Sequence, residues 1–107
     1  MMTRTENLYI VAQEECAEIS QAVSKIMRFG ESNHHPDKPD ETNARHLLTE
    51  YYQLQAVMEM IIDHGLLGHM SEEEIAAIKA NKKCKVSDYA CLSESLGRIR
   101  EEKTYGV

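Results

Sequence analysis

The chain has 107 residues, with 12 Lys and Arg against 18 Asp and Glu and a net charge of -6. This length suits one domain without a second core, and a hydrophobic content of 42% is too high for a disordered tail. The acidic balance excludes nonspecific attraction to a nucleic-acid backbone, and no segment approaches the ~18 apolar residues of a membrane span. We therefore expect a single domain over residues 1–107, with neither nucleic acid nor a membrane as its partner.

Cysteine use and the first residues favour a cytoplasmic protein. Cys16, Cys84 and Cys91 lack the pair spacing of a zinc site, so free thiols in a reducing compartment are the simpler interpretation. Met1 to Thr5 contain no apolar core of a signal peptide. We expect the protein to be soluble and cytoplasmic.

The first predicted helix covers about residues 6–29, because apolar residues recur there at i, i+3, i+4 and i+7. Gly30 ends it, as a C-terminal glycine often does. The apolar stripe of this helix consists of Leu8, Val11, Ile19, Ala22 and Ile26.

A loop follows over residues 31–40, which contain Pro36 and Pro39. Asp40 or Thr42 can cap the second predicted helix, which covers about residues 41–64. The stripe of this helix consists of Leu47, Leu54, Val57 and Ile61.

Two shorter helices are predicted in the rest of the chain. Ser71 and Glu74 form a capping box that opens a helix over about residues 72–81, and Ser87-Asp88 begins another over about 88–102. The last five residues are expected to fray. The expected fold is therefore all-α: an antiparallel helical bundle of two long and two shorter helices that assembles as an oligomer.

Glutamates interrupt both apolar stripes. Glu15 lies in the middle of the first stripe, with Glu18 at its edge and Glu14 on the other shoulder. Glu50 lies at the centre of the second stripe, and Gln53 follows three residues later. Antiparallel packing of the two helices would bring the side chains of Glu15, Glu18, Glu50 and Gln53 together.

A lone buried carboxylate costs several kcal/mol unless something compensates for it. Neither stripe has a Lys or Arg at its centre, which leaves protonation or a hard cation such as Mg²⁺, held by carboxylates, waters and phosphate oxygens. The alternative is that these acids lie at the solvated edge of a loose bundle. In that case the protein is a helical interaction module without a ligand.

The Glu14-Glu15-Cys-Ala-Glu18 segment, the Lys25 to Gly30 segment and Glu50 in the next helix resemble the MazG-like all-α nucleoside triphosphate pyrophosphohydrolase family, small phage and prophage members above all. The family pattern is E-E-x-x-E on one helix and E-x-x-D on the next. The resemblance covers roughly residues 6–65. It implies dimers or tetramers that need Mg²⁺, with Mn²⁺ as a possible substitute, and a location in the host cytoplasm for a phage-encoded member.

The resemblance implies hydrolysis of a (d)NTP to the monophosphate and pyrophosphate. The implied metal ligands are Glu15, Glu18 and Glu50, with Glu14 beside them to orient a water or a second metal. Lys25 and Arg28 lie beyond the acids and could reach phosphate oxygens, or be ordinary solvated charges. Asn43 and Tyr52 are further candidates for nucleotide contacts, although a helix start explains Asn43 equally well and core or interface packing is the commoner role of such a tyrosine.

One position departs from the family pattern. Gln53 stands where the family has an aspartate, and Gln offers Mg²⁺ a neutral oxygen but no charge and no base. Two expectations follow: a pyrophosphohydrolase with fewer ligands, or a non-catalytic nucleotide-binding protein that sequesters a host nucleotide signal.

Overall fold

The computed structural model describes residues 1–100 and 102, and within them it contains three helices and no strand. The helices are α1 (Arg4–Phe29), α2 (Asn43–Asp63) and α3 (Glu72–Ser95), which confirms the all-α class. The chain divides into two units, Met1–His69 and Met70–Val107. The organisation of the whole chain as a single domain stays a prediction.

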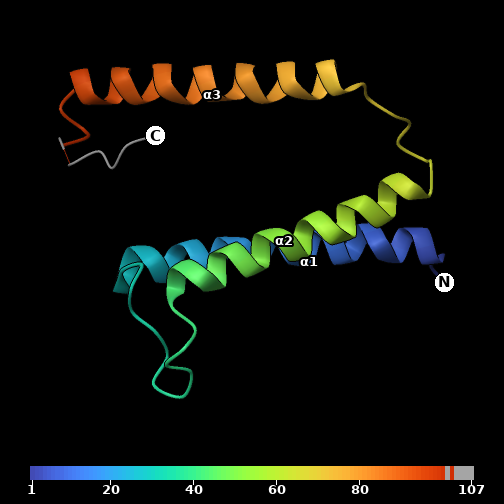
Figure 1. Cartoon of the computed structure of the whole chain (residues 1–107), viewed down its shortest axis with the longest axis horizontal. Coiled ribbons are helices and arrows are strands. Elements are labelled where there is room, and N and C mark those ends of the chain that lie inside the picture. Colours follow the sequence, from blue (N-terminus) through green and yellow to red (C-terminus); the bar gives the residue numbers. More distant parts are fainter. Residues whose placement is uncertain (101, 103–107) are drawn as a thin grey trace. The chain divides into compact units, whose positions relative to one another are not determined.

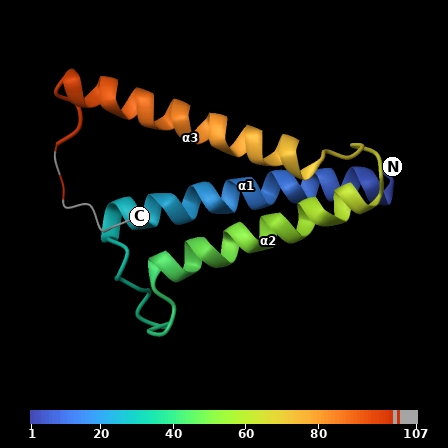
Figure 2. The same cartoon turned by 45° about the horizontal axis from the view of Figure 1, so that its top comes forward.

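Helices α1 and α2 lie side by side and antiparallel within the first unit (Figures 1 and 2). Each begins at a threonine cap: the Thr3 hydroxyl accepts a hydrogen bond from the Glu6 amide, and the Thr42 hydroxyl accepts one from the Arg45 amide, both at 3.1 Å. Gly30 ends α1 with a φ of 90°, which suits a residue without a Cβ. The expected Thr42 cap and Gly30 stop are therefore confirmed.

The contact between α1 and α2 is built from the two predicted apolar stripes, and we call it the seam. Ala22 and Ile61 are 0% and 1% exposed, and every other stripe residue is half-buried. Apolar residues beside the stripes, such as Met27 and Leu48, remain exposed. Burying a side chain such as Ile61 contributes roughly 1.5–3 kcal/mol, so the first unit has a narrow core that tolerates few defects.

The loop between α1 and α2 is tied to both helices by hydrogen bonds. The amide of Asn43 donates to the Asn33 carbonyl at 2.8 Å, and the amide of Ala44 donates to the Glu31 carbonyl at 3.0 Å. The side-chain amide of Asn43 also donates to the Gly30 carbonyl at 2.9 Å. Asn43 therefore links the first turn of α2 to the end of α1.

In the C-terminal unit the prediction of two short helices is wrong. A single helix, α3, runs through residues 82–87, where the sequence analysis placed a break between two helices. No Gly or Pro occurs between Glu72 and Ser95, and Ser87-Asp88 sits inside the helix instead of capping a new one. The Ser71–Glu74 capping box is present as predicted.

Helix α3 ends before Gly97, which has a φ of 73°. Residue 101, in the expected fourth helix, and the expected frayed segment 103–107 lie outside the described residues. None of the helices in the described part of the chain is both long and apolar enough to cross a membrane.

Replacing Asn43 with Ala should lower the stability of the first unit by about 1 kcal/mol, because the Gly30 carbonyl loses its side-chain donor. Thermal unfolding followed by circular dichroism measures the change. Asn7→Ala, at an exposed position of α1, is the control. Equal melting temperatures for Asn43→Ala and the control would contradict the role of this hydrogen bond.

Candidate metal centre

Three glutamates converge across the seam, and we call them the acidic cluster: Glu15 and Glu18 from α1, and Glu50 from α2. One carboxylate oxygen of each lies within 4.8 Å of those of the other two. The i, i+3 spacing of Glu15 and Glu18 puts both on the same face of α1, towards α2. The structure therefore brings together the three residues that the sequence analysis proposed as metal ligands.

The carboxylates differ in burial. Glu50 is 8% exposed, Glu15 is half-buried and Glu18 is exposed. The Oε2 atoms of Glu15 and Glu50 are buried and have no hydrogen-bond partner. Buried polar atoms without a partner are rare and costly in folded proteins, so two such atoms in one small seam call for a proton or a cation.

Burial and mutual repulsion raise the pKa of both seam carboxyls. Burial is the main cause of the raised pKa of Glu15, followed by the charges of Glu18 and Glu14 and by a hydrogen bond with Glu18. Burial is also the main cause of the raised pKa of Glu50, followed by a hydrogen bond with Glu18 and by the charge of Glu18. The charge of His46 lowers the pKa of Glu50, whereas the charge of Glu15 raises it.

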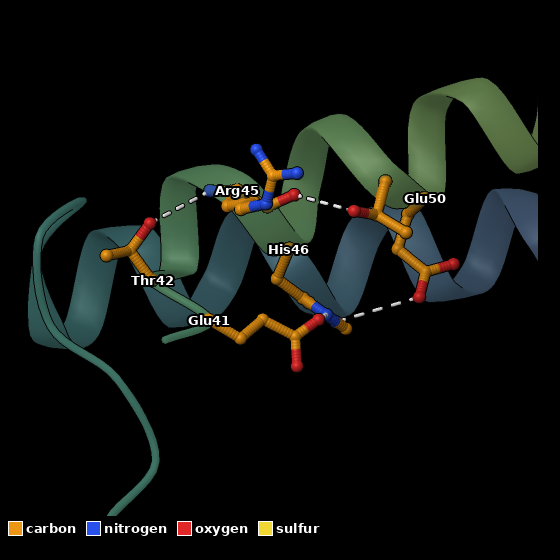
Figure 3. Close-up of polar contacts among 6 residues, drawn as sticks. Glu41, Thr42, Arg45, His46 and Glu50 are labelled. Atoms are coloured by element: carbon orange, nitrogen blue, oxygen red, sulfur yellow. Dashed lines mark hydrogen bonds and ion pairs between the residues drawn. The ribbon is translucent and has the colours of Figure 1, made fainter. Parts of the chain in front are cut away.

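His46 lies between two carboxylates, as Figure 3 shows. Its Nδ1 is 3.2 Å from Oε1 of Glu41, and its Nε2 is 3.7 Å from Oε1 of Glu50. The contact with Glu41 fixes the ring, and the longer contact with Glu50 compensates for only one of the two Glu50 oxygens. Oε2 of Glu50 is still buried without a partner.

The donor set suits a hard divalent cation. Within residues 1–100 and 102, no Lys or Arg forms an ion pair with a glutamate of the acidic cluster. Carboxylate oxygens are ligands that Mg²⁺ and Mn²⁺ prefer, and one oxygen of each of the three glutamates lies close enough to the others to share one ion. Protonation is the competing solution, and the raised pKa values favour it at low pH.

The other predicted site residues divide into two groups. Glu14 is exposed, and its charge acts on Glu15. Lys25 and Asn43 line a hollow of about 610 Å³ formed by the end of α1, the loop and the start of α2, which we call the loop groove. Arg28 does not line it; the Arg28 guanidinium carbon lies 5.2 Å from the centre of the Phe29 ring.

Tyr52 and Gln53 are exposed and line a different hollow, along α2, with Arg45, Leu48, Thr49 and Ala56. The rings of Tyr51 and Tyr52 meet edge to face, with their centres 4.9 Å apart. Gln53 therefore belongs to an outer surface of α2, whereas Glu50 points into the seam.

Sequence reasoning underrated two features. The sequence indicates the contact between His46 and Glu50, because residues at i and i+4 are neighbours on one helix face. No sequence pattern indicates the loop groove, because its walls depend on how the loop folds back between Gly30 and Asn43.

Searches against protein-family models, curated proteins and solved structures find no match to this chain. The likeness to MazG-like pyrophosphohydrolases therefore stays a prediction from motif spacing. The geometry of the acidic cluster is a separate observation that does not depend on this likeness.

Replacing Glu50 with Gln should stabilise the metal-free protein at neutral pH. A carboxyl whose pKa is raised in the folded state stabilises the fold at low pH, and this contribution is lost as the pH rises above its ordinary value of 4.5. The variant should match the parent near pH 4 and melt a few degrees higher at pH 7, the shift expected from about 1 kcal/mol.

Melting curves in a chelator between pH 4 and pH 8 measure this difference. Glu59→Gln, an identical substitution at an exposed position of α2, is the control. A Glu50→Gln variant that melts below the parent at pH 7 in the chelator would show that the Glu50 carboxylate has a compensating partner within the protein.

Proposed function

We propose that this chain is a divalent-metal-dependent nucleotide pyrophosphohydrolase that cleaves a (d)NTP to the monophosphate and pyrophosphate. One observation carries the proposal: Glu15 and Glu50 meet across the seam, each with a buried carboxylate oxygen that has no partner. A ligand-free interaction module would gain nothing from this costly arrangement. The motif spacing adds the nucleotide phosphates as the ligand that accompanies the cation.

In this proposal Glu15, Glu18 and Glu50 hold Mg²⁺ or Mn²⁺. Such an ion, when bound, neutralises phosphate charge and makes water more acidic. Glu14 is exposed beside the acidic cluster, where its carboxylate accepts a proton from water as the water oxygen attacks the α-phosphorus. The bond from this phosphorus to the oxygen that bridges to the β-phosphate breaks, and pyrophosphate leaves. Lys25, in the loop groove, is placed to meet phosphate oxygens.

A second candidate function keeps the pocket and lacks the reaction: a non-catalytic protein that sequesters a nucleotide signal. The position of Gln53 favours it, because this neutral side chain is exposed on α2 and adds no fourth carboxylate to the acidic cluster. Three carboxylates suffice to hold one cation but leave less charge for a second.

We also propose that the chain acts as a homo-oligomer, a dimer or a tetramer. Among the described residues only Ala22 and Ile61 are buried apolar residues, whereas Tyr51, Tyr52, Leu48 and Met60 on α2 are all more than half exposed. A chain of this length needs a larger buried apolar area than the seam supplies. Association of copies would bury this surface.

The test of the main proposal is incubation of the protein with a panel of ribo-, deoxyribo- and cyclic nucleotides and Mg²⁺, with chromatography of the products and melting curves of the same samples. We expect at least one triphosphate to give a monophosphate and pyrophosphate, and a Mg²⁺-dependent rise in melting temperature, because a ligand of the native state stabilises it. Glu50→Gln should abolish both effects, whereas Glu59→Gln should retain them.

The outcomes separate the candidates. Release of pyrophosphate that Glu50→Gln abolishes supports the pyrophosphohydrolase. A thermal shift with full recovery of unaltered nucleotide supports sequestration. A melting temperature that no combination of nucleotide and metal changes would leave the interaction module as the function.

Light scattering after size-exclusion chromatography tests the oligomer. We expect a mass of two or four chains, and Leu48→Lys together with Tyr51→Lys should shift it towards one chain, because charged groups disfavour burial of this surface. A single-chain mass for the parent at all concentrations would refute the assembly.

A further inference from the structure

The loop groove lies beside the acidic cluster, and one residue connects the two. His46 lines the loop groove, and its Nε2 is 3.7 Å from Oε1 of Glu50. Figure 3 shows the His46 ring between the Glu41 and Glu50 carboxylates. A ligand with one end at the acidic cluster therefore reaches the loop groove by passing the His46 ring.

Two lysine ammonium groups in the loop groove are free to contact an anionic ligand. Lys25 comes from α1 and Lys38 from the loop, and no residue in the described part of the chain forms an ion pair with either ammonium group. The lining also holds two acids: Glu41 contacts His46, and the Asp37 carboxylate lies 3.6 Å from His35 with its side chain 86% exposed to water. The loop groove thus offers two ammonium groups, unpaired within the described residues, near the proposed metal site.

Phe29 supplies an aromatic surface in the same hollow. It lines the loop groove at the end of α1 and is 55% exposed, although Arg28 lies over its ring. An exposed aromatic ring next to cationic side chains is a stacking platform for a planar heterocycle on a phosphate chain.

Several polar groups of the loop groove are already engaged. Oδ1 of Asn33 accepts the His34 amide at 2.8 Å, and Nδ1 of His34 lies 2.9 Å from the carbonyl oxygen of His35. The side-chain amide of Asn43 donates to the Gly30 carbonyl. Few of these groups remain to read the hydrogen-bonding edge of a base, so stacking has to supply most of the base recognition.

We propose that the loop groove is the nucleoside subsite of the nucleotide site: the base stacks on Phe29, and Lys25 and Lys38 contact phosphate oxygens. The inference rests on the proposed function, since it assumes a nucleotide whose phosphates lie at the acidic cluster. Because every base presents a ring face, purine and pyrimidine triphosphates bind with similar affinity, within about tenfold of one another.

The experiment compares four ribonucleoside triphosphates with inorganic tripolyphosphate, which has the phosphates but no ring. Calorimetry in Mg²⁺ gives the dissociation constants of the parent, Phe29→Leu and Lys38→Gln. Phe29→Leu weakens all four nucleotides about tenfold and leaves tripolyphosphate unchanged, because only the stacking surface is lost. Lys38→Gln weakens nucleotides and tripolyphosphate alike, about three- to fivefold.

Arg4→Gln is the control, because it removes one positive charge from α1 about 30 Å along the helix from Lys25. It should leave all the constants unchanged. Circular dichroism spectra and melting curves verify that each variant folds. Lys38 is an exposed loop residue, so Lys38→Gln keeps the test valid if Phe29→Leu disturbs the end of α1.

Failure of this subsite is distinguishable from failure of the proposed function. Binding of Mn²⁺ alone, followed by electron paramagnetic resonance, and its loss in Glu50→Gln report on the acidic cluster. If Mn²⁺ and tripolyphosphate bind but Phe29→Leu changes the dissociation constants of nucleotides and tripolyphosphate equally, the loop groove proposal is overturned. The proposed metal site at the acidic cluster is then still supported. A protein that binds neither Mn²⁺ nor any phosphate compound overturns both.

Discussion

Two carboxylates that face each other inside the seam set the conditions for the rest of the first unit. Glu15 and Glu50 occupy positions that the helical repeat assigns to apolar residues, and each leaves an oxygen without a partner. The unit has few buried apolar residues to offset their cost. Burying charge in so small a core costs free energy, which a proton or a cation would offset.

His46 illustrates partial compensation. The imidazole is held by Glu41 and touches one oxygen of Glu50, so it steadies the Glu50 side chain without neutralising the acidic cluster. The same ring forms part of the loop groove. His46 therefore links the loop groove to the acidic cluster, and a movement of α2 at His46 would displace a wall of the loop groove and the Glu50 side chain together.

The seam and its acids were predictable from sequence because both depend on the period of one helix at a time. Residues at i, i+3 and i+4 share a face wherever the helix lies, so the positions of Glu15, Glu18 and Glu50 followed from spacing. The partner of Asn43 and the walls of the loop groove did not, since they depend on the path of the loop. The continuity of α3 was missed because Ser87-Asp88 resembles a cap equally well inside a helix and at its start.

Ala22 has a consequence for the acidic cluster. It is fully buried, and a small side chain at this position of the seam allows the α1 and α2 backbones to approach closely. The distance between the backbones in turn sets the width of the oxygen cage that Glu15, Glu18 and Glu50 form. A bulkier side chain two turns away from Glu15 would splay the helices and shift the cage from ions with short oxygen bonds, such as Mg²⁺, towards the larger radius of Ca²⁺. In the proposed metal site, the choice of ion would thus depend on a residue outside the acidic cluster.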